Sequence, residues 1–229
     1  MMRIGLFGGT FNPIHRCHLV IAAQARDRLR LDHILFIPSG HPPHKPSEPL
    51  AEARHRLEMV RRAIAGDPSS QVSEVELRRP TTSYSIETVR TLRGEYGPNA
   101  ELFFLIGLDA FLEFPSWRQA SELLQACHFV VVSRPGSAFL SLSAMPLLPK
   151  IAPALLTALD ARSQDRVDVP IPGGTGLTLL GLPPCDASAS EIRDRLRKRL
   201  SLSTLLPVSV ESYIIRFGLY QEESDRTGV

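Results

Sequence analysis

Two histidines near the N-terminus, His15 and His18, are the residues of this 229-residue chain whose types and spacing most directly suggest chemistry. They follow a Gly8-Gly9-Thr10 turn, and Pro13 can open a helix in which residues three apart share a face. The apolar residues 3–7 before the turn predict a buried strand. Each part is common without a ligand. Glycines, however, admit a ligand to the backbone and a helix N-terminus favours anions, so the combination indicates a phosphate site.

The rest of the chain alternates short apolar runs with segments of helical period. Runs typical of buried strands occur at residues 4–7, 33–38, 72–75, 102–106, 129–132 and 177–180. Helical spacing occurs at residues 19–29, 54–64, 85–92 and 117–124. This alternation predicts an α/β fold, a Rossmann-like, doubly wound and mostly parallel sheet with helices on both faces. Ligands of such sheets bind beyond the carboxyl ends of the strands, where the histidine segment lies.

Length and composition suggest how the chain is organised. With 229 residues and 43% hydrophobic content, the sequence predicts a single domain over residues 1–220. Residues 136–175 contain many prolines and glycines, so a less regular insertion with a helical part is expected there. A small C-terminal helical part is expected at 185–220, where apolar residues from Pro207 to Tyr220 would pack on the core. Residues 221–229 are expected to form a disordered tail.

Charge and cysteine content narrow the class of protein. A net charge of +2 is too small to indicate a nucleic-acid binder. Cys17, Cys127 and Cys185 are far apart and odd in number, which argues against a disulfide framework and against a zinc cluster and favours a reducing cytoplasm. The chain has neither a leader-like start nor an 18-residue uncharged apolar run. We therefore expect a cytoplasmic protein that binds no membrane; a homo-oligomer is compatible with the sequence.

A second anion-binding segment is predicted near the C-terminus. Ser188, Ser190 and Arg193 stand at the start of a helical pattern. Two hydroxyls, free helix N–H groups and an arginine can converge there on an anion. Ser188 and Glu191 also have the spacing of a capping box, which needs no ligand. The sequence leaves both interpretations open.

Polar groups also follow several predicted strands. Lys45 lies in a proline-rich loop after the second strand, where a lysine can reach a phosphate. Gly107 and Asp109 follow the fourth strand, and Arg134 follows the fifth, where it can act as a charge clamp. Ser85 is placed to cap a helix. Because these groups come at strand ends, they are candidates for the same ligand site.

These segments together resemble the nicotinate-nucleotide adenylyltransferase family of nucleotidyltransferases. Residues 7–18 are similar to its Gly-Gly-Thr-Phe-(Asp/Asn)-Pro-Ile-His-x-Gly-His signature, and residues 187–193 to Ile-Ser-(Ser/Ala)-Thr-x-x-Arg. Its further elements match in order and spacing at 42–45 (Pro-Pro-His-Lys), 82–85 (Thr-Ser-Tyr-Ser), 107–117 (Gly-x-Asp to Trp) and 134–136 (Arg-Pro-Gly). The first signature departs at Cys17, where the family has glycine, and a side chain there would crowd a nucleotide lying against the helix.

The resemblance implies a reaction. ATP and nicotinate mononucleotide would give nicotinate adenine dinucleotide and pyrophosphate, a step of NAD biosynthesis, by in-line attack at the α-phosphorus without a covalent enzyme intermediate. Mg²⁺ would be held through the substrate phosphates, with no protein metal site. Nicotinamide mononucleotide or phosphopantetheine as acceptor are alternatives. A different alternative is a non-catalytic nucleotide-binding relative in which Cys17 disrupts the catalytic turn.

The resemblance also implies roles for individual residues. His15, His18 and Arg193 would be catalytic. The residues expected to bind ATP, together with those three, are Gly8, Gly9, Thr10, Phe11, Gly107, Asp109, Ser188 and Ser190. The residues expected to bind nicotinate mononucleotide are Asn12, Lys45, Ser85, Trp117, Arg118 and Arg134. Among these, Trp117 would stack on the pyridine ring, Lys45 would face the mononucleotide phosphate, and backbone N–H groups near Ser85 and Arg118 would meet the ring carboxylate.

Overall fold

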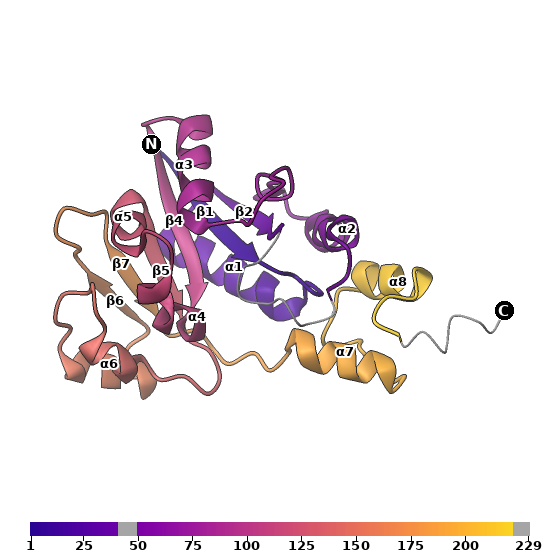
Figure 1. Ribbon diagram of the computed structural model, residues 1–229. Coiled ribbons are helices and arrows are strands. Elements are labelled where there is room, and N and C mark those ends of the chain that lie inside the picture. Colours follow the sequence, from indigo (N-terminus) through magenta and orange to yellow (C-terminus); the bar gives the residue numbers. More distant parts are fainter. Residues whose placement is uncertain (41–49, 222–229) are drawn as a thin grey trace.

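A sheet of seven strands runs through the described part of the protein in the computed structural model, which covers residues 1–40 and 50–221 (Figure 1). Lys45 and the predicted tail from residue 222 onward lie outside it. The strands are β1 (Met2–Gly9), β2 (His33–Pro38), β3 (Ser70–Val72), β4 (Ala100–Gly107), β5 (His128–Val132), β6 (Arg166–Val169) and β7 (Leu177–Leu180). Their spatial order is β3-β2-β1-β4-β5-β7-β6. Every neighbouring pair is parallel except β6 and β7, which confirms the predicted mostly parallel sheet.

Helices cover both faces of this sheet (Figure 1). The helices are α1 (Arg16–Leu29), α2 (Ala53–Ile64), α3 (Ser85–Tyr96), α4 (Leu108–Leu112), α5 (Ala120–Ala126), α6 (Pro153–Asp160), α7 (Ala189–Arg197) and α8 (Val208–Arg216), with short 3-10 turns at Phe114–Ser116 and Phe139–Ala144. One buried apolar cluster joins the sheet to α3 through α6, and a second joins it to α1, α2, α7 and α8. The fold is therefore doubly wound, as predicted.

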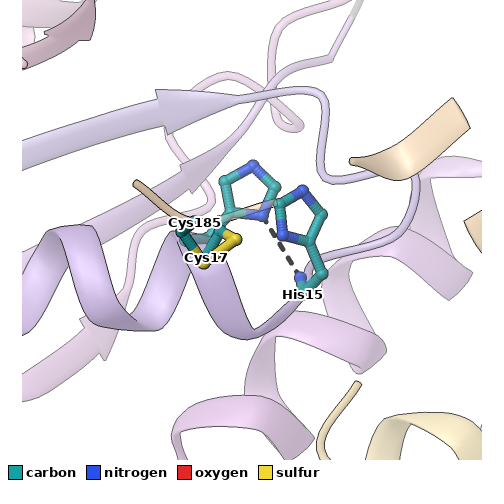
Figure 2. Close-up of a disulfide and its surroundings, with 4 residues drawn as sticks. His15, Cys17 and Cys185 are labelled. Carbon is teal, nitrogen blue, oxygen red and sulfur yellow. Dashed lines mark hydrogen bonds between the residues drawn. A yellow bond between two sulfur atoms is a disulfide. The ribbon is translucent and has the colours of Figure 1, made fainter. Parts of the chain in front are cut away.

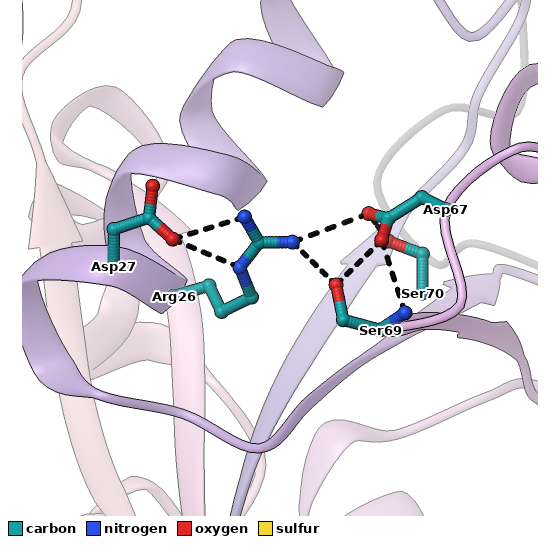
Figure 3. A network of polar contacts seen from close by, with 5 residues as sticks. All are labelled: Arg26, Asp27, Asp67, Ser69 and Ser70. Atoms are coloured by element: carbon teal, nitrogen blue, oxygen red, sulfur yellow. Dashed lines mark hydrogen bonds and ion pairs between the residues drawn. The ribbon is translucent and has the colours of Figure 1, made fainter.

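Two strand predictions need correction. The third strand was expected at 72–75 but is formed by Ser70–Val72. It follows a turn that begins at Asp67, whose carboxylate accepts hydrogen bonds from Ser69 N–H (3.0 Å) and Ser70 Oγ (2.7 Å). Arg26 of α1 forms an ion pair with the same carboxylate (3.4 Å) and so ties the helix to this turn (Figure 3). β6 was not predicted at all, since only its alternate residues Val167 and Val169 are buried and the strand contains no apolar run.

Two helix predictions also need correction. The helix expected at 117–124 begins only at Ala120, because the chain first makes a 3-10 turn containing Pro115, and Trp117 stands after that turn. In α8, Val210, Tyr213 and Ile214 pack on the core as expected, whereas Val208 and Phe217 are 70% and 46% exposed. None of the helices in the described residues has the length and apolar character that crossing a membrane requires.

The cysteine count argued against a disulfide framework, but the structure contains one disulfide. Cys17 in the first turn of α1 is bonded to Cys185, which lies between β7 and α7 and is 168 residues away in sequence (Figure 2). Such a separation gives no sign of proximity until the fold brings the two segments together. Cys127 is a buried free thiol.

Candidate active site

The strand order reverses between β1 and β4, since β2 and β3 continue on one side of β1 and β4 and β5 on the other. At this switch point parallel sheets bind their ligands. A cavity of about 670 Å³ opens there, within the size range of small-molecule sites. It is lined by Gly8, Gly9 and Thr10 after β1, by Ser39 after β2, by Ile106 and Gly107 of β4, and by Tyr84, Ser85, Trp117 and Arg118 from the loops and helices above.

The glycine turn after β1 borders this cavity directly. A Cβ atom placed on Gly8 would meet nothing within 4 Å, so the backbone there faces open space and a ligand can approach it. A Cβ on Gly9 would lie 3.1 Å from the ring of Phe11. The positive φ of the turn belongs to Phe11 (47°), whose ring is 2% exposed. Gly8 therefore serves mainly to let a ligand approach the backbone closely, and not to make the turn tight.

The two histidines lie side by side at the start of α1. The helix begins at Arg16 and not at Pro13, so His15 is its N-cap residue in extended conformation and only His18 lies within the helix. The residues between β1 and the helix form a turn that contains a cis Asn12-Pro13 peptide. The prediction of two helical histidines is wrong in that respect. The imidazole centroids are nevertheless 3.8 Å apart.

Both imidazoles are held in the neutral form. Burial, with Arg134 nearby, lowers the pKa of His15 to about 4. The pKa of His18 is lowered by burial and by the neighbouring His15 and Arg134. The backbone N–H of His15 donates to Nδ1 of His18 at 3.2 Å (dashed line in Figure 2), so the proton of a neutral His18 resides on Nε2. That ring can donate a hydrogen bond to an oxygen without carrying a charge of its own.

The second predicted anion segment meets the first. Ser188 is the N-cap of α7, and its Oγ accepts from the N–H of Glu191 at 3.1 Å, as the capping spacing predicts. Arg193 is 8% exposed and donates to the carbonyl oxygen of Asn12 (2.9 Å) and, more weakly, to Oγ of Ser190 (3.4 Å). A contact across 181 positions of sequence thus joins α7 to the turn that carries the histidines.

Arg134 lies on the histidine side of the site rather than on the wall of the larger cavity. It lines a smaller cavity of about 210 Å³ together with Cys17, Ser133, Leu182 and Cys185. Its Nε is 3.6 Å from Oδ1 of Asp109. A Cβ on Gly107 would come within 2.5 Å of that Oδ1, so glycine is required for Asp109 to approach the end of β4. Gly107, Asp109 and Arg134 therefore form one group between the two cavities.

The residues expected to hold the mononucleotide are partly brought together. Ser85, Trp117 and Arg118 line the larger cavity, and the guanidinium of Arg118 stacks 4.5 Å from the ring centroid of Tyr84. Ser85 is the first residue of α3 and not its cap, because Tyr84 occupies the N-cap position. The N–H groups of Glu87 and Thr88 donate to the carbonyl oxygen of Tyr84 (3.0 and 3.2 Å), and the helix start at Ser85 borders the cavity.

Asn12, by contrast, is 4% exposed and links two loops. Its Oδ1 accepts from the N–H of Ala51 (3.0 Å) and its carbonyl from Arg193.

Sequence reasoning missed two buried charged residues beside the cavity. Arg56 of α2 is 2% exposed and donates to the carbonyl oxygens of Thr10 (2.9 Å) and Ser39 (2.8 Å), both at the cavity. Glu76 is 9% exposed, burial raises its pKa, and it accepts from Oγ1 of Thr88 at 2.9 Å. The sequence could have indicated the burial of Arg56, because it lies three and four residues before Met59 and Val60, on the apolar face of its helix.

The fold and the site are those of a nucleotidyltransferase. The family model of the cytidylyltransferase-like proteins matches residues 6–195, which include both anion segments. A "Probable nicotinate-nucleotide adenylyltransferase" of Pelobacter propionicus is 43% identical, covering 96% of this chain and 99% of that protein. One of Moorella thermoacetica, with the same description, is 36% identical, covering 97% and 94%. The chain therefore belongs to the cytidylyltransferase-like family and, within it, to the nicotinate-nucleotide adenylyltransferases.

Solved structures share the fold at much lower identity. A Plasmodium falciparum nicotinic acid mononucleotide adenylyltransferase complexed with NaAD superposes with a TM-score of 0.70 at 18% identity, covering 96% of this chain and 98% of that one. The same enzyme complexed with APC gives a TM-score of 0.68. The likeness over nearly the whole of both chains agrees with the doubly wound sheet described above.

Proposed function

We propose that this chain transfers the adenylyl group of ATP to nicotinate mononucleotide, giving nicotinate adenine dinucleotide and pyrophosphate in NAD biosynthesis. The observation that carries the proposal is the contact between Arg193 and Asn12, which joins the two anion segments beside a pair of neutral histidines. Next to this junction lies a cavity of the size that a nucleotide needs. Membership of the nicotinate-nucleotide adenylyltransferases supports the choice of acceptor.

The histidine pair is proposed to stabilise charge on the reacting phosphate. An oxygen of the mononucleotide phosphate bonds to the α-phosphorus of ATP while the bond from that phosphorus to the bridging oxygen breaks, and pyrophosphate leaves. Charge grows on the bridging and equatorial oxygens. Neutral His15 and His18 would donate hydrogen bonds to these oxygens, and Arg193 with Ser188 and Ser190 would hold the β- and γ-phosphates. Because the donors are already in place, little reorganisation accompanies the reaction.

On the nucleotide side, Gly8, Gly9, Thr10 and Phe11 would let the triphosphate lie against the turn after β1. Gly107 and Asp109 would contact the adenosine part. Arg134 was expected on the mononucleotide, and its place near both histidines makes it a charge clamp for the joined phosphates.

The acceptor would occupy the larger cavity. Trp117 would stack on the pyridine ring, and the ring carboxylate would meet the N–H groups at the start of α3, near Ser85 and Arg118. An anion gains more than an amide from a helix N-terminus, which favours nicotinate over nicotinamide. Asn12 would orient the loop beneath the mononucleotide, and Lys45 is proposed to reach its phosphate.

Nucleotidyltransferases that use ATP generally need a divalent metal ion. Among the described residues there is no group of three His, Cys, Asp or Glu side chains able to hold one. We propose that this ion is Mg²⁺, a hard cation that binds through phosphate oxygens and water, and that it arrives bound to the triphosphate. When bound, it would neutralise part of the triphosphate charge.

Pyrophosphate release tests the reaction directly. With ATP and Mg²⁺, nicotinate mononucleotide should support turnover well above nicotinamide mononucleotide or phosphopantetheine, and omission of the metal should abolish it. Turnover with phosphopantetheine alone would refute the assignment of the acceptor. ATP binding without pyrophosphate release from any acceptor, reversed by Cys17→Gly, would instead identify a non-catalytic relative.

The proposed partners are these small molecules, and the proposed location is the cytoplasm. The disulfide removes the argument for that location that came from the cysteine content. Cell fractionation with an antibody to the chain tests it.

A further inference from the structure

The Cys17–Cys185 disulfide is placed where the two anion segments meet. Cys17 lies in the first turn of α1, between the two histidines, and Cys185 lies three residues before Ser188, the N-cap of α7 (Figure 2). Their Cα atoms are 5.6 Å apart. The disulfide therefore attaches the segment that precedes α7, the helix of Arg193, to the first turn of α1, next to the histidine pair.

The segment that carries Cys185 has few other attachments. Leu182 is held at the end of β7, where its N–H donates to Oγ of Ser133 at 2.9 Å. Ser188 is held next by its capping bond with α7. Between these two residues the described structure records no backbone hydrogen bond. For residues 183–187 the disulfide is thus the covalent restraint that sets their path.

The body of α7 is held independently of the disulfide. Ile192 and Leu196 are buried in the cluster beneath α1 and α2. Past the end of α7, the carbonyl of Leu205 accepts from the backbone N–H of Arg16 (2.9 Å), and that of Leu206 from its Nε (3.1 Å). Breaking the disulfide should therefore free the approach to Ser188 without releasing the helix from the core.

The smaller cavity lies directly beside the bond. Both cysteines line it, with Arg134, Ser133 and Leu182. Figure 2 shows the two sulfur atoms close to the side chain of His15.

We propose that the Cys17–Cys185 disulfide is a positioning element for ATP, and the proposal rests on the ATP site assigned above. The bond holds residues 183–187 against α1 so that Ser188, Ser190 and Arg193 are arranged before ATP arrives, and binding loses less conformational entropy. Reduction by a dithiol adds two electrons and two protons. The S–S bond breaks, two thiols form, and the dithiol is oxidised to its own disulfide. ATP affinity then depends on the redox state of the protein.

Steady-state kinetics of the full chain, oxidised and after reduction with dithiothreitol, test this. Thiol titration of the unfolded protein should count one thiol before reduction and three after it. Reduction should raise the KM for ATP about tenfold, while kcat and the KM for nicotinate mononucleotide change less than about twofold. Cys185→Ser should reproduce the reduced values and no longer respond to dithiothreitol. Cys127→Ala, which leaves the disulfide intact, should respond as the natural chain does.

If reduction raised the KM for ATP and the KM for nicotinate mononucleotide equally, the disulfide would stabilise the site as a whole, and the proposal would be overturned. An unchanged or lower KM for ATP would also overturn it. Direct binding separates this inference from the proposed reaction. Calorimetry with a non-hydrolysable ATP analogue should give about tenfold weaker binding after reduction, whether or not adenylyl transfer occurs. If the enzyme transfers the adenylyl group but its ATP affinity does not change on reduction, the positioning role of the disulfide is refuted and the proposed reaction is not.

A second readout uses the reverse coupling. Because the proposed triphosphate ligands Ser188, Ser190 and Arg193 follow Cys185 closely in the chain, ATP should slow the release of thiols by dithiothreitol, whereas nicotinate mononucleotide alone should not. Identical reduction rates with and without saturating ATP would contradict the proposed arrangement.

Discussion

Arg56 provides a sharp test of how the site is assembled. Its guanidinium donates to the carbonyl oxygens of Thr10 (2.9 Å), Ser39 (2.8 Å) and Ala51 (3.0 Å), with a longer bond to Gly40 (3.4 Å). The side chain is 2% exposed. Arg56 thus joins the turn after β1, the end of β2 and the approach to α2. Arg56→Met keeps most of the side-chain volume but leaves these carbonyls without their donor.

The expected cost follows from the three well-formed bonds. A hydrogen bond to a charged group contributes about 1.5–3 kcal/mol, and the desolvation of the buried guanidinium offsets part of the sum. We expect a loss of about 3–4 kcal/mol in the free energy of unfolding. In a chain of this size each kcal/mol lowers Tm by about 2–4 °C, so the melting temperature should fall by about 10 °C.

Thermal unfolding followed by circular dichroism measures this loss. Arg61→Met is the matched control, because Arg61 lies on the same helix in a half-exposed ion pair with Glu74, and it should change Tm by less than about 2 °C. Arg56→Lys should lie between Arg56→Met and the natural chain, since an ammonium cannot span carbonyls from three segments. An Arg56→Met variant that melts within about 2 °C of the natural chain would refute the reasoning.

Three further predictions concern the site itself. His18→Ala should lower kcat by at least about 100-fold in pyrophosphate release, the scale for losing one preorganised donor, and near-normal turnover would remove His18 from the mechanism. Burial lowers the pKa of His15 in the folded protein to about 4, whereas in the unfolded chain this imidazole takes up a proton as the pH falls below about 6.5. The free energy of unfolding should therefore decline by about 3 kcal/mol as the pH falls to about 4. His15→Asn should lose that part of the decline in Tm, and an unchanged pH profile would contradict the buried neutral state. Trp117, the single tryptophan, should change its fluorescence with nicotinate mononucleotide but not with ATP. Trp117→Ala should raise the KM for the mononucleotide about tenfold, and a rise for ATP instead would place the acceptor elsewhere.

The strands that form the centre of the sheet were predictable because both of their faces are buried. β1, β4 and β5 each contain an uninterrupted apolar run, which a parallel strand between two layers of helices requires. At the edge of the sheet that signal fails. β6 has one solvent-facing side, so Arg166 and Asp168 alternate with the buried valines and no run forms.

The chemical groups of the site were also visible in the sequence, but their exact placement was not. The spacing of His15 and His18 predicted neighbouring rings, and the rings are neighbours. Sequence spacing assumed a helix from Pro13, whereas His15 is a cap residue, because the turn after β1 uses the preceding residues. Ser85 shows the same error of one position, since Tyr84 takes the cap of α3.

The sequence by itself determined the local patterns of this protein: buried strands, helices between them, and two short segments rich in phosphate-binding groups. These depend on residues close together in the chain, whose periodicity and backbone preferences act locally. Tertiary structure alone decided that Arg193 reaches Asn12, that Arg56 is buried under the cavity, and that Cys17 meets Cys185. Each of these contacts joins residues that are distant in the chain, and only the packing of helices on the sheet brings them within bonding distance.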